Sequence, residues 1–161
     1  MTRSASCPPS PEVKAFSITQ RPIEVTPLRR AVLDDTCGAL VVFEGLVRNH
    51  HEGRDVSALR YTHHPVMAER EGLKILSETL ARFDITHALA VHRVGDLSIG
   101  DCAVVTLTAS SHREEAFAAN QYLIDRIKFE VPIWKYETYL DGVSEWTAPC
   151  PRCAAGVDHR H

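Results

Sequence analysis

The residues best able to do chemistry in this chain are cationic side chains at both ends of one segment, residues 111–135 (SHREEAFAANQYLIDRIKFEVPIWK). Ser111 and Glu114 have the S-x-x-E spacing of a capping box, which predicts a helix that begins at this serine. His112 and Arg113 would then lie in the first turn, where unpaired backbone N–H groups and the positive end of the helix dipole favour a phosphate or carboxylate. The spacing indicates an anion site, with an ordinary solvated helix start as the alternative.

Two lysines lie toward the other end of the same segment. The apolar residues of the helix recur at helical spacing and define one face: Ala116, Phe117, Ala119, Leu123, Ile124 and Ile127. Lys128 lies at the edge of that face, where its stem can cover apolar surface and its amine can lie in a partly dry environment, with simple snorkelling as the alternative. The helix is expected to end before Pro132, and residues 133–140 then form a strand that carries Lys135.

Arg113 and Lys128 are too far apart to contact one small substrate within a single chain. They are fifteen residues apart in the sequence, which is roughly 22 Å at the rise of an α-helix. If all these cations serve one site, His112 and Arg113 must come from a second copy of the chain. We therefore expect the site to lie at a boundary between two subunits.

Three segments resemble one known family. The stretch SSHREEAFAANQYLIDRIKFEVPIWKYE resembles the signature of the large, catalytic subunit of molybdopterin synthase. Upstream, GALVVFEGLVRNHHEGRDVSALRYTHHPVMAE resembles the family's first core strand, its V-R-N-H turn and the next strand leading into a helix. VHRVGDLSIGDCAVVTLTAS resembles its following hairpin, so the resemblance covers about residues 37–147.

This resemblance implies a fold and an activity. Members of the family have an α/β hammerhead-type fold with an additional antiparallel β-sheet, so the expected class is α+β. They form a homodimer at the core of a heterotetramer, with a small ubiquitin-like sulfur-carrier subunit bound at each end. Sulfur passes from the carrier's C-terminal Gly-Gly thiocarboxylate to cyclic pyranopterin monophosphate and forms the molybdopterin dithiolene, a step of molybdenum cofactor biosynthesis. The resemblance thus implies a sulfurtransferase that needs no metal or redox cofactor.

The resemblance also assigns site residues, position by position. Lys128 and Lys135 match the two catalytic lysines of the family. The matching substrate-binding residues are Leu46, Val47, Arg48, His112, Arg113, Lys128, Lys135, Tyr136 and Glu137. Lys128, taken as the more desolvated lysine, suits activation of the thiocarboxylate carbonyl or proton transfer, whereas Lys135 suits binding of the substrate anion. Arg48 could bind phosphate through two parallel hydrogen bonds. Leu46 stands where some relatives have a lysine, so only its backbone is expected to contact the substrate.

Composition excludes several classes of protein. The chain has 161 residues, 44% of them hydrophobic and 24% charged, with a formal net charge of −3, and a chain of this length can bury a core of its own. It has no long Lys/Arg stripe of the kind that binds nucleic acid nonspecifically. No apolar run approaches the roughly 18 residues that span a bilayer, and residues 1–13 lack the hydrophobic centre of a secretory signal. We expect a cytoplasmic protein without nucleic-acid or membrane partners.

The five cysteines do not predict a disulfide framework, because their number is odd and no export signal precedes them. Cys37 and Cys102 fall in strand-like segments and are expected to pack as small hydrophobes. The tail contains four residues of metal-ligating types: Cys150, Cys153, His159 and His161. A C-x-x-C pair is a common half of a zinc site, but the His-x-His half has an unusual spacing, so a tail without metal is the preferred interpretation.

Strands and helices interleave along the chain with several short turns, which favours an α+β fold over a doubly wound parallel sheet. A disordered start (1–13) should precede one catalytic-subunit domain (14–147) and a flexible Cys/His-containing tail (148–161). Strands are expected at residues 14–25, 38–47, 56–63, 85–94, 102–110 and 133–140. Helices are expected at residues 26–35, 65–83 and 111–131. The nearly continuous apolar run 38–47 predicts a buried central strand.

Two other functions remain open from the sequence. In the first, the chain is a noncatalytic adaptor that binds a ubiquitin-like partner and only scaffolds sulfur transfer. In the second, the C-x-x-C tail is the functional site of a small zinc or thiol protein. Replacement of Lys128 tests the first alternative, and deletion of residues 150–161 tests the second.

Overall fold

The computed structural model describes residues 14–147. The expected disordered start (1–13) and flexible tail (148–161), with its cysteines and histidines, lie outside the described residues. The elements in chain order are β1 (Phe16–Thr19), α1 (Val25–Val32), β2 (Ala39–Leu46), β3 (His50–His51), β4 (Arg54–His63), α2 (Met67–Arg82), β5 (His87–Arg93), β6 (Gly95–Leu97), β7 (Cys102–Ser110), α3 (Arg113–Glu130), β8 (Ile133–Tyr139) and β9 (Ser144–Thr147).

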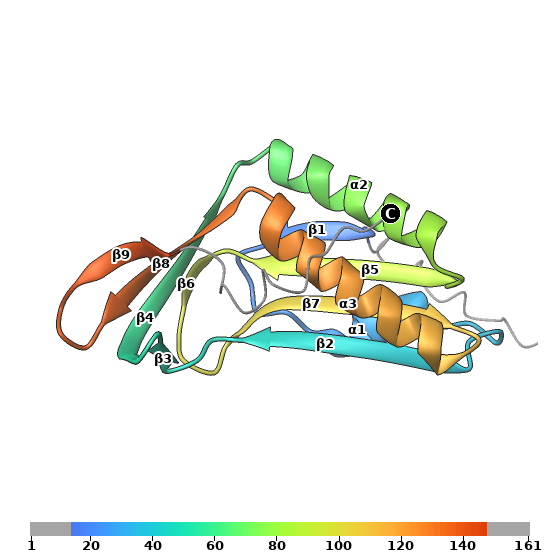
Figure 1. The fold of residues 1–161 in the computed structure, drawn as a ribbon, viewed down its shortest axis with the longest axis horizontal. Coiled ribbons are helices and arrows are strands. Elements are labelled where there is room, and N and C mark those ends of the chain that lie inside the picture. The colour runs from blue at the N-terminus through green and yellow to red at the C-terminus, as the bar shows by residue number, and fades with distance from the viewer. Residues whose placement is uncertain (1–13, 148–161) are drawn as a thin grey trace, which may run out of the picture.

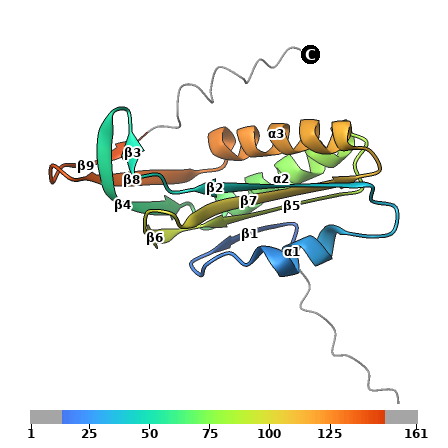
Figure 2. The same cartoon turned by 90° about the horizontal axis from the view of Figure 1, so that it is seen from below.

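The first sheet has four strands in the order β1-β5-β7-β2. Strand β1 is parallel to β5, and the other neighbours are antiparallel. Helices α2 and α3 lie side by side across one face of this sheet (Figure 1), and α1 covers the opposite face (Figure 2). A buried sheet between two helical layers explains why β5 and β7 are apolar along nearly their whole length.

The side chains of β5 and β7 alternate between the two helical layers. Leu89, Val91, Val105 and Leu107 pack with α1, whereas Ala88 and Ala90 belong to the core beneath α2 and α3. Helix α2 approaches β1 closely because Gly72 has no side chain: a Cβ there would lie 2.4 Å from the ring of Phe16. Local packing of this kind fixes where α2 and α3 lie on the sheet.

The second sheet is antiparallel and extends from one end of the first (Figure 1). Its strands run in the order β3-β4-β8-β9, and β6 pairs with β4. A small cluster of buried side chains joins the two sheets: Val47, Leu59, Leu97 and Ala103. The expected α+β class and the additional antiparallel sheet are confirmed. Among residues 14–147, no helix is long and apolar enough to cross a membrane.

Strand β2 is an edge strand, so its prediction as a buried central strand was wrong. Among the strands of residues 14–147 it pairs only with β7, and its side chains are half-buried or exposed. An apolar run cannot distinguish a strand with two paired neighbours from an edge strand that has one. The unpaired edge of β2 leaves backbone N–H and C=O groups that another strand could pair with.

The start of α3 also differs from the prediction. The N-cap residue is His112, not Ser111, and no side chain caps the helix. Ser111 Oγ instead donates to the carbonyl oxygen of Thr36 at 3.3 Å. The capping box is therefore absent, and Arg113, rather than His112, is the first residue of the helix.

The buried face of α3 contains Asn120 instead of Phe117. Phe117 is 62% exposed, whereas Asn120 is 3% exposed. The amide of Asn120 accepts from the Thr106 hydroxyl at 3.0 Å and donates to the backbone carbonyls of Val41 and Thr106, both at 3.2 Å. These bonds tie α3 to both β2 and β7 and satisfy the buried amide.

Candidate active site

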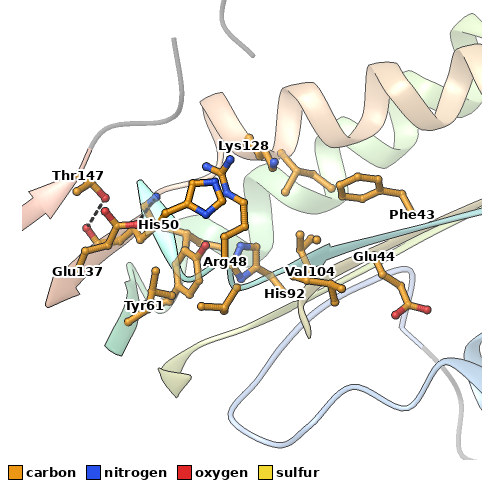
Figure 3. Close-up of a pocket in the computed structure, with 17 residues that line it drawn as sticks. Phe43, Glu44, Arg48, His50, Tyr61, His92, Val104, Lys128, Glu137 and Thr147 are labelled. Atoms are coloured by element: carbon orange, nitrogen blue, oxygen red, sulfur yellow. Dashed lines mark hydrogen bonds and ion pairs between the residues drawn. The ribbon is translucent and has the colours of Figure 1, made fainter. Parts of the chain in front are cut away.

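A cavity of about 540 Å³ lies where the two sheets meet the C-terminal end of α3 (Figure 3). Its walls come from seven strands and one helix, which are spread along the sequence. Six of the residues assigned from the family resemblance line it: Leu46, Val47, Arg48, Lys128, Lys135 and Glu137. Three cations from three separate segments therefore face one space.

The end of β2 positions Arg48 at this cavity. Val47 is 6% exposed and packs in the cluster that joins the sheets. Its backbone donates to Asp101 O at 2.9 Å and accepts from Gly100 N at 2.8 Å. Because Val47 is fixed in this way, its neighbours Leu46 and Arg48 remain exposed at the cavity. Figure 3 shows Arg48 extending into the space beneath the end of α3.

Lys128 is exposed, and its ammonium lies 5.7 Å from the centre of the Phe43 ring, within cation–π range. None of the ion pairs formed within residues 14–147 includes Lys128. The prediction that Lys128 is the more desolvated lysine was wrong for the single chain, because the side chain of Lys135 is only 21% exposed. The difference arises because Lys128 follows the last buried turn of α3, whereas Lys135 projects from a sheet.

Lys135 is held by a buried acid on its own strand. The side chains of Lys135 and Glu137 lie on one face of β8, since residues two apart in a strand point the same way. Glu137 is 3% exposed, and its Oε1 lies 2.9 Å from Lys135 Nζ. Its Oε2 accepts from the Tyr139 hydroxyl at 2.9 Å and lies 2.7 Å from Nδ1 of buried His51.

These contacts keep Glu137 ionised. Burial alone would raise the pKa of Glu137, but the hydrogen bond and charge of Lys135, with help from Tyr139 and His51, hold the pKa below its ordinary value. An ionised carboxylate only accepts hydrogen bonds, so Nδ1 of His51 carries a proton in this contact. The network fixes the direction of the Lys135 ammonium at the cavity.

His92 of β5 lies in the wall of the cavity and was not selected from the sequence. It is 7% exposed, its Nδ1 donates to the Arg93 carbonyl oxygen at 2.8 Å, and its ring contacts Tyr61 edge-on at 5.0 Å between centroids. Burial lowers the pKa of His92 from 6.5 to about 4, and the charge of Lys128 adds to the effect. His92 is thus neutral at pH 7. A histidine inside an apolar strand carries no sequence signal that separates this role from simple packing.

Three of the assigned residues do not line the cavity. Tyr136 lies on the opposite face of β8 from Lys135 and Glu137, where its ring packs on Trp146 with centroids 5.0 Å apart. His112 and Arg113 lie at the other end of α3 from Lys128, roughly 22 Å away at the α-helical rise. A single chain therefore brings together only part of the assigned set.

The cavity suits an anionic ligand that also has an apolar part. Arg48, Lys128 and Lys135 supply positive charge, while Phe43 and Val104 supply apolar wall. Charge-assisted hydrogen bonds from such groups bind phosphates and carboxylates. Among residues 14–147, the one group of three side chains spaced to hold a metal ion together lies elsewhere, at Asp34, Cys37 and His87.

Comparisons with known proteins agree with this arrangement. The family model described as MoaE protein matches residues 18–130. The molybdopterin synthase catalytic subunit of Staphylococcus epidermidis is 41% identical over 134 residues, covering 83% of this chain and 89% of that protein. The catalytic subunit of Staphylococcus carnosus is 42% identical, with the same coverage.

Solved structures show the same fold. Molybdopterin synthase from Staphylococcus aureus superposes with a TM-score of 0.80 at 38% identity, covering 86% of this chain and 100% of that one. A complex of subunits 1 and 2 of the molybdopterin-converting factor from Helicobacter pylori gives a TM-score of 0.68 at 19% identity, over 90% of this chain and 99% of that one, which is a likeness of fold. On the extent of the family match and the identity to these relatives, the chain belongs to the MoaE protein family.

Proposed function

We propose that this chain is the catalytic subunit of a molybdopterin synthase. It transfers sulfur from the C-terminal thiocarboxylate of a small ubiquitin-like carrier to cyclic pyranopterin monophosphate, and the product is the dithiolene of molybdopterin. The observation that carries the proposal is the convergence of Arg48, Lys128 and Lys135 on one cavity. Both reactants are anionic, so a cluster of cations is what their binding requires.

The environments of the two lysines support different roles. Lys135 is paired with buried Glu137 at 2.9 Å, which fixes the direction of its ammonium at the cavity. It is therefore suited to hold the substrate anion in one position. Lys128 is exposed at the cavity and forms no ion pair within residues 14–147. Lys128 is the better candidate for proton transfer at the reacting atoms.

Arg48 and His92 complete the chain's own part of the proposed site. The guanidinium of Arg48 can make two parallel hydrogen bonds to a phosphate, which a lysine cannot reproduce. Neutral His92 lines the wall and adds no charge that would compete with Lys128. The exposed position of Lys128 at the cavity leaves room for the end of a second protein to approach it.

We also propose that a second copy supplies His112 and Arg113. Within one chain these residues are at the wrong end of α3, and the exposed start of that helix is where an anion would bind. The edge strand β2 ends at the cavity, and one of its sides is unpaired within residues 14–147, so another chain could contact it. Mixing Arg113→Ala chains with Lys128→Ala chains tests this: a shared site predicts partial recovery of activity in mixed dimers, and no recovery would count against it.

Product formation tests the main proposal directly. The purified chain is mixed with a thiocarboxylated carrier and cyclic pyranopterin monophosphate, and dithiolene is measured in single turnovers. Lys128→Ala should lower the rate by roughly 10²- to 10⁴-fold with little change in the melting temperature, because Lys128 is exposed and forms no ion pair within residues 14–147.

Lys74→Ala is the matched control. Lys74 is an exposed lysine of α2, and its nearest acid, Glu71, is 3.8 Å away. Its replacement should leave the rate unchanged. If Lys128→Ala forms product as fast as Lys74→Ala, the chain is an adaptor rather than the catalyst.

A further inference from the structure

We propose that Asp34, Cys37 and His87 form a binding site for a divalent transition-metal ion of the zinc class. Asp34 and Cys37 belong to the loop between α1 and β2, and His87 is the first residue of β5. One ligand atom from each residue lies within 4.8 Å of the others. The side chains come from two segments about fifty positions apart in the sequence, so the fold itself assembles the group.

The spacing is close to that of ligands around one ion. Asp34 Oδ2 lies 3.7 Å from His87 Nδ1, and Cys37 Sγ lies 3.5 Å from Asp34 Oδ1. In a tetrahedral zinc site, metal–ligand bonds of about 2.0 to 2.3 Å separate neighbouring ligand atoms by roughly 3.3 to 3.6 Å. The two distances involve different oxygens of the same carboxylate, and one ligand atom from each residue lies within 4.8 Å of the others, so side-chain rotations would bring the three groups to coordination distance.

His87 supplies an independent sign of a ligand. Its Nδ1 is buried yet has no hydrogen-bond partner within residues 14–147, and the distance to Asp34 is too long for a hydrogen bond. Buried polar atoms normally have partners, so an unsatisfied one requires an explanation. A metal ion between Nδ1, the carboxylate and the thiol would satisfy it.

The surrounding groups orient the ligands. Asp34 Oδ1 accepts from the backbone N–H of Thr36 at 2.8 Å and from its hydroxyl at 2.5 Å, which leaves Oδ2 directed to His87. Carboxylate ligands that are themselves hydrogen-bonded are a regular feature of metal sites.

The thiol of Cys37 is also held in place. The hydroxyl of Thr86 donates to the Ala109 carbonyl oxygen at 2.9 Å, so its oxygen accepts from the Cys37 S–H at 3.3 Å. Cys37 is thus in a polar environment, contrary to the prediction that it packs as a small hydrophobe. On binding, the metal–sulfur bond replaces the S–H bond, and the proton leaves to solvent.

The donor set indicates the class of ion. Thiolate and imidazole are soft or borderline ligands that favour Zn²⁺, Co²⁺ or Ni²⁺ over Mg²⁺ and Ca²⁺. Three protein ligands leave a fourth position for water, and the partial exposure of Asp34 and His87 gives the ion a path from solvent.

The site is distant from the proposed active site in one chain, because β2 separates them: its eight residues extend roughly 25 Å. A bound ion would join the α1–β2 loop to β5 and stabilise the fold.

Cobalt is the probe for the test, because Co²⁺ bound to a thiolate gives an intense near-ultraviolet absorption band. The full chain carries Cys150→Ser and Cys153→Ser, so that the tail C-x-x-C cannot contribute. We expect the band to saturate at one Co²⁺ per chain and Zn²⁺ to displace the cobalt. Cys37→Ser should abolish the band, and His87→Gln should weaken binding at least tenfold.

Cys102→Ser is the matched control, since Cys102 is the other cysteine within residues 14–147 and its thiol contacts the backbone oxygen of Val104. It should leave the band intact. Zn²⁺ should also raise the melting temperature of the Cys150→Ser/Cys153→Ser chain and slow alkylation of Cys37 by iodoacetamide, mapped by mass spectrometry. This second readout remains valid if Cys37→Ser fails to fold. A cobalt band that survives Cys37→Ser, or alkylation of Cys37 at the same rate with and without Zn²⁺, would overturn the proposal.

Discussion

Glu137→Gln tests the buried hydrogen-bond network that both holds Lys135 at the cavity and stabilises the fold. The substitution keeps the size of the side chain but removes the charge that pairs with Lys135. Glu137 now accepts from Lys135, Tyr139 and His51, at 2.9, 2.9 and 2.7 Å. A glutamine has one acceptor oxygen and an NH₂ group, which would face a donor from at least one of these partners.

The expected cost is about 2 kcal/mol of unfolding free energy at pH 7. A hydrogen bond to a charged group contributes about 1.5 to 3 kcal/mol, and the three bonds are not additive because they share one carboxylate. Relief from burying the charge offsets part of the loss. For a chain of this length, about 2 kcal/mol corresponds to a fall in melting temperature of about 4 to 8 °C.

The effect should depend on pH in a defined direction. The pKa of Glu137 is lower in the folded chain than its ordinary value of 4.5. A group with a lowered folded pKa stabilises the fold above its unfolded pKa, and that contribution is lost as the pH falls through the folded pKa. The difference in free energy of unfolding between the unsubstituted chain and Glu137→Gln (the stability gap) should therefore be constant above about pH 5.5 and become smaller below pH 4.5.

Urea unfolding followed by circular dichroism at several pH values measures the gap. Glu145→Gln is the matched control, because Glu145 pairs with Glu137 in the β8–β9 ladder but is 49% exposed and forms a surface ion pair with Arg54. Surface pairs contribute about 0 to 1 kcal/mol. Equal costs for the two substitutions, or a gap that widens in acid, would refute the role assigned to the Glu137 network.

Two further predictions concern buried polar groups outside the cationic cluster. Asn120→Ala should lower the free energy of unfolding, measured in urea, by about 2 to 3 kcal/mol, because it leaves the Val41 carbonyl and two groups of Thr106 without their partner. The control Gln121→Ala, at an exposed position of the same helix, should lower it by less than 0.5 kcal/mol. The pKa of His92 is about 4 in the folded chain, compared with about 6.5 in the unfolded chain. As the pH falls below 6.5, His92 is therefore protonated in the unfolded chain before it is protonated in the folded one. The free energy of unfolding should fall between pH 6.5 and 4, with a slope approaching about 1.4 kcal/mol per pH unit. His92→Phe should lack this part of the slope; equal slopes in the two proteins would contradict the burial of a neutral histidine.

The sequence predicted most elements of the fold because their signals are local. β7 begins and ends where the apolar run does, and α2 and β8 differ from their predictions by only a few residues. The error on β2 occurs because its position in the sheet depends on distant parts of the chain. β2 is an edge strand because no other described strand lies beyond it. The residues of β2 alone do not predict this edge position.

The error on α3 could have been avoided by spacing alone. Residues 116, 119, 120, 123, 124 and 127 follow the helical repeat, and all of them are buried. Residue type alone misplaces two side chains, because the polar Asn120 is buried and the apolar Phe117 is exposed. A polar residue at a core position of an otherwise regular repeat predicts a satisfied buried amide, which Asn120 is.

The proposed site shows the same division between local and distant information. Strand alternation alone places Glu137 beside Lys135 and directs Tyr136 to the other face, so the sequence Lys-Tyr-Glu already predicts one lysine paired with an acid. Nothing local predicts that His51, eighty-six positions away, completes the network. The pairing makes the two lysines unequal in geometry: Glu137 holds the Lys135 ammonium at 2.9 Å, whereas Lys128 is exposed and forms no ion pair within residues 14–147. Glu137→Gln should therefore weaken the binding of substrate by Lys135 in the single-turnover assay, whereas the exposed control Glu145→Gln should leave it unchanged.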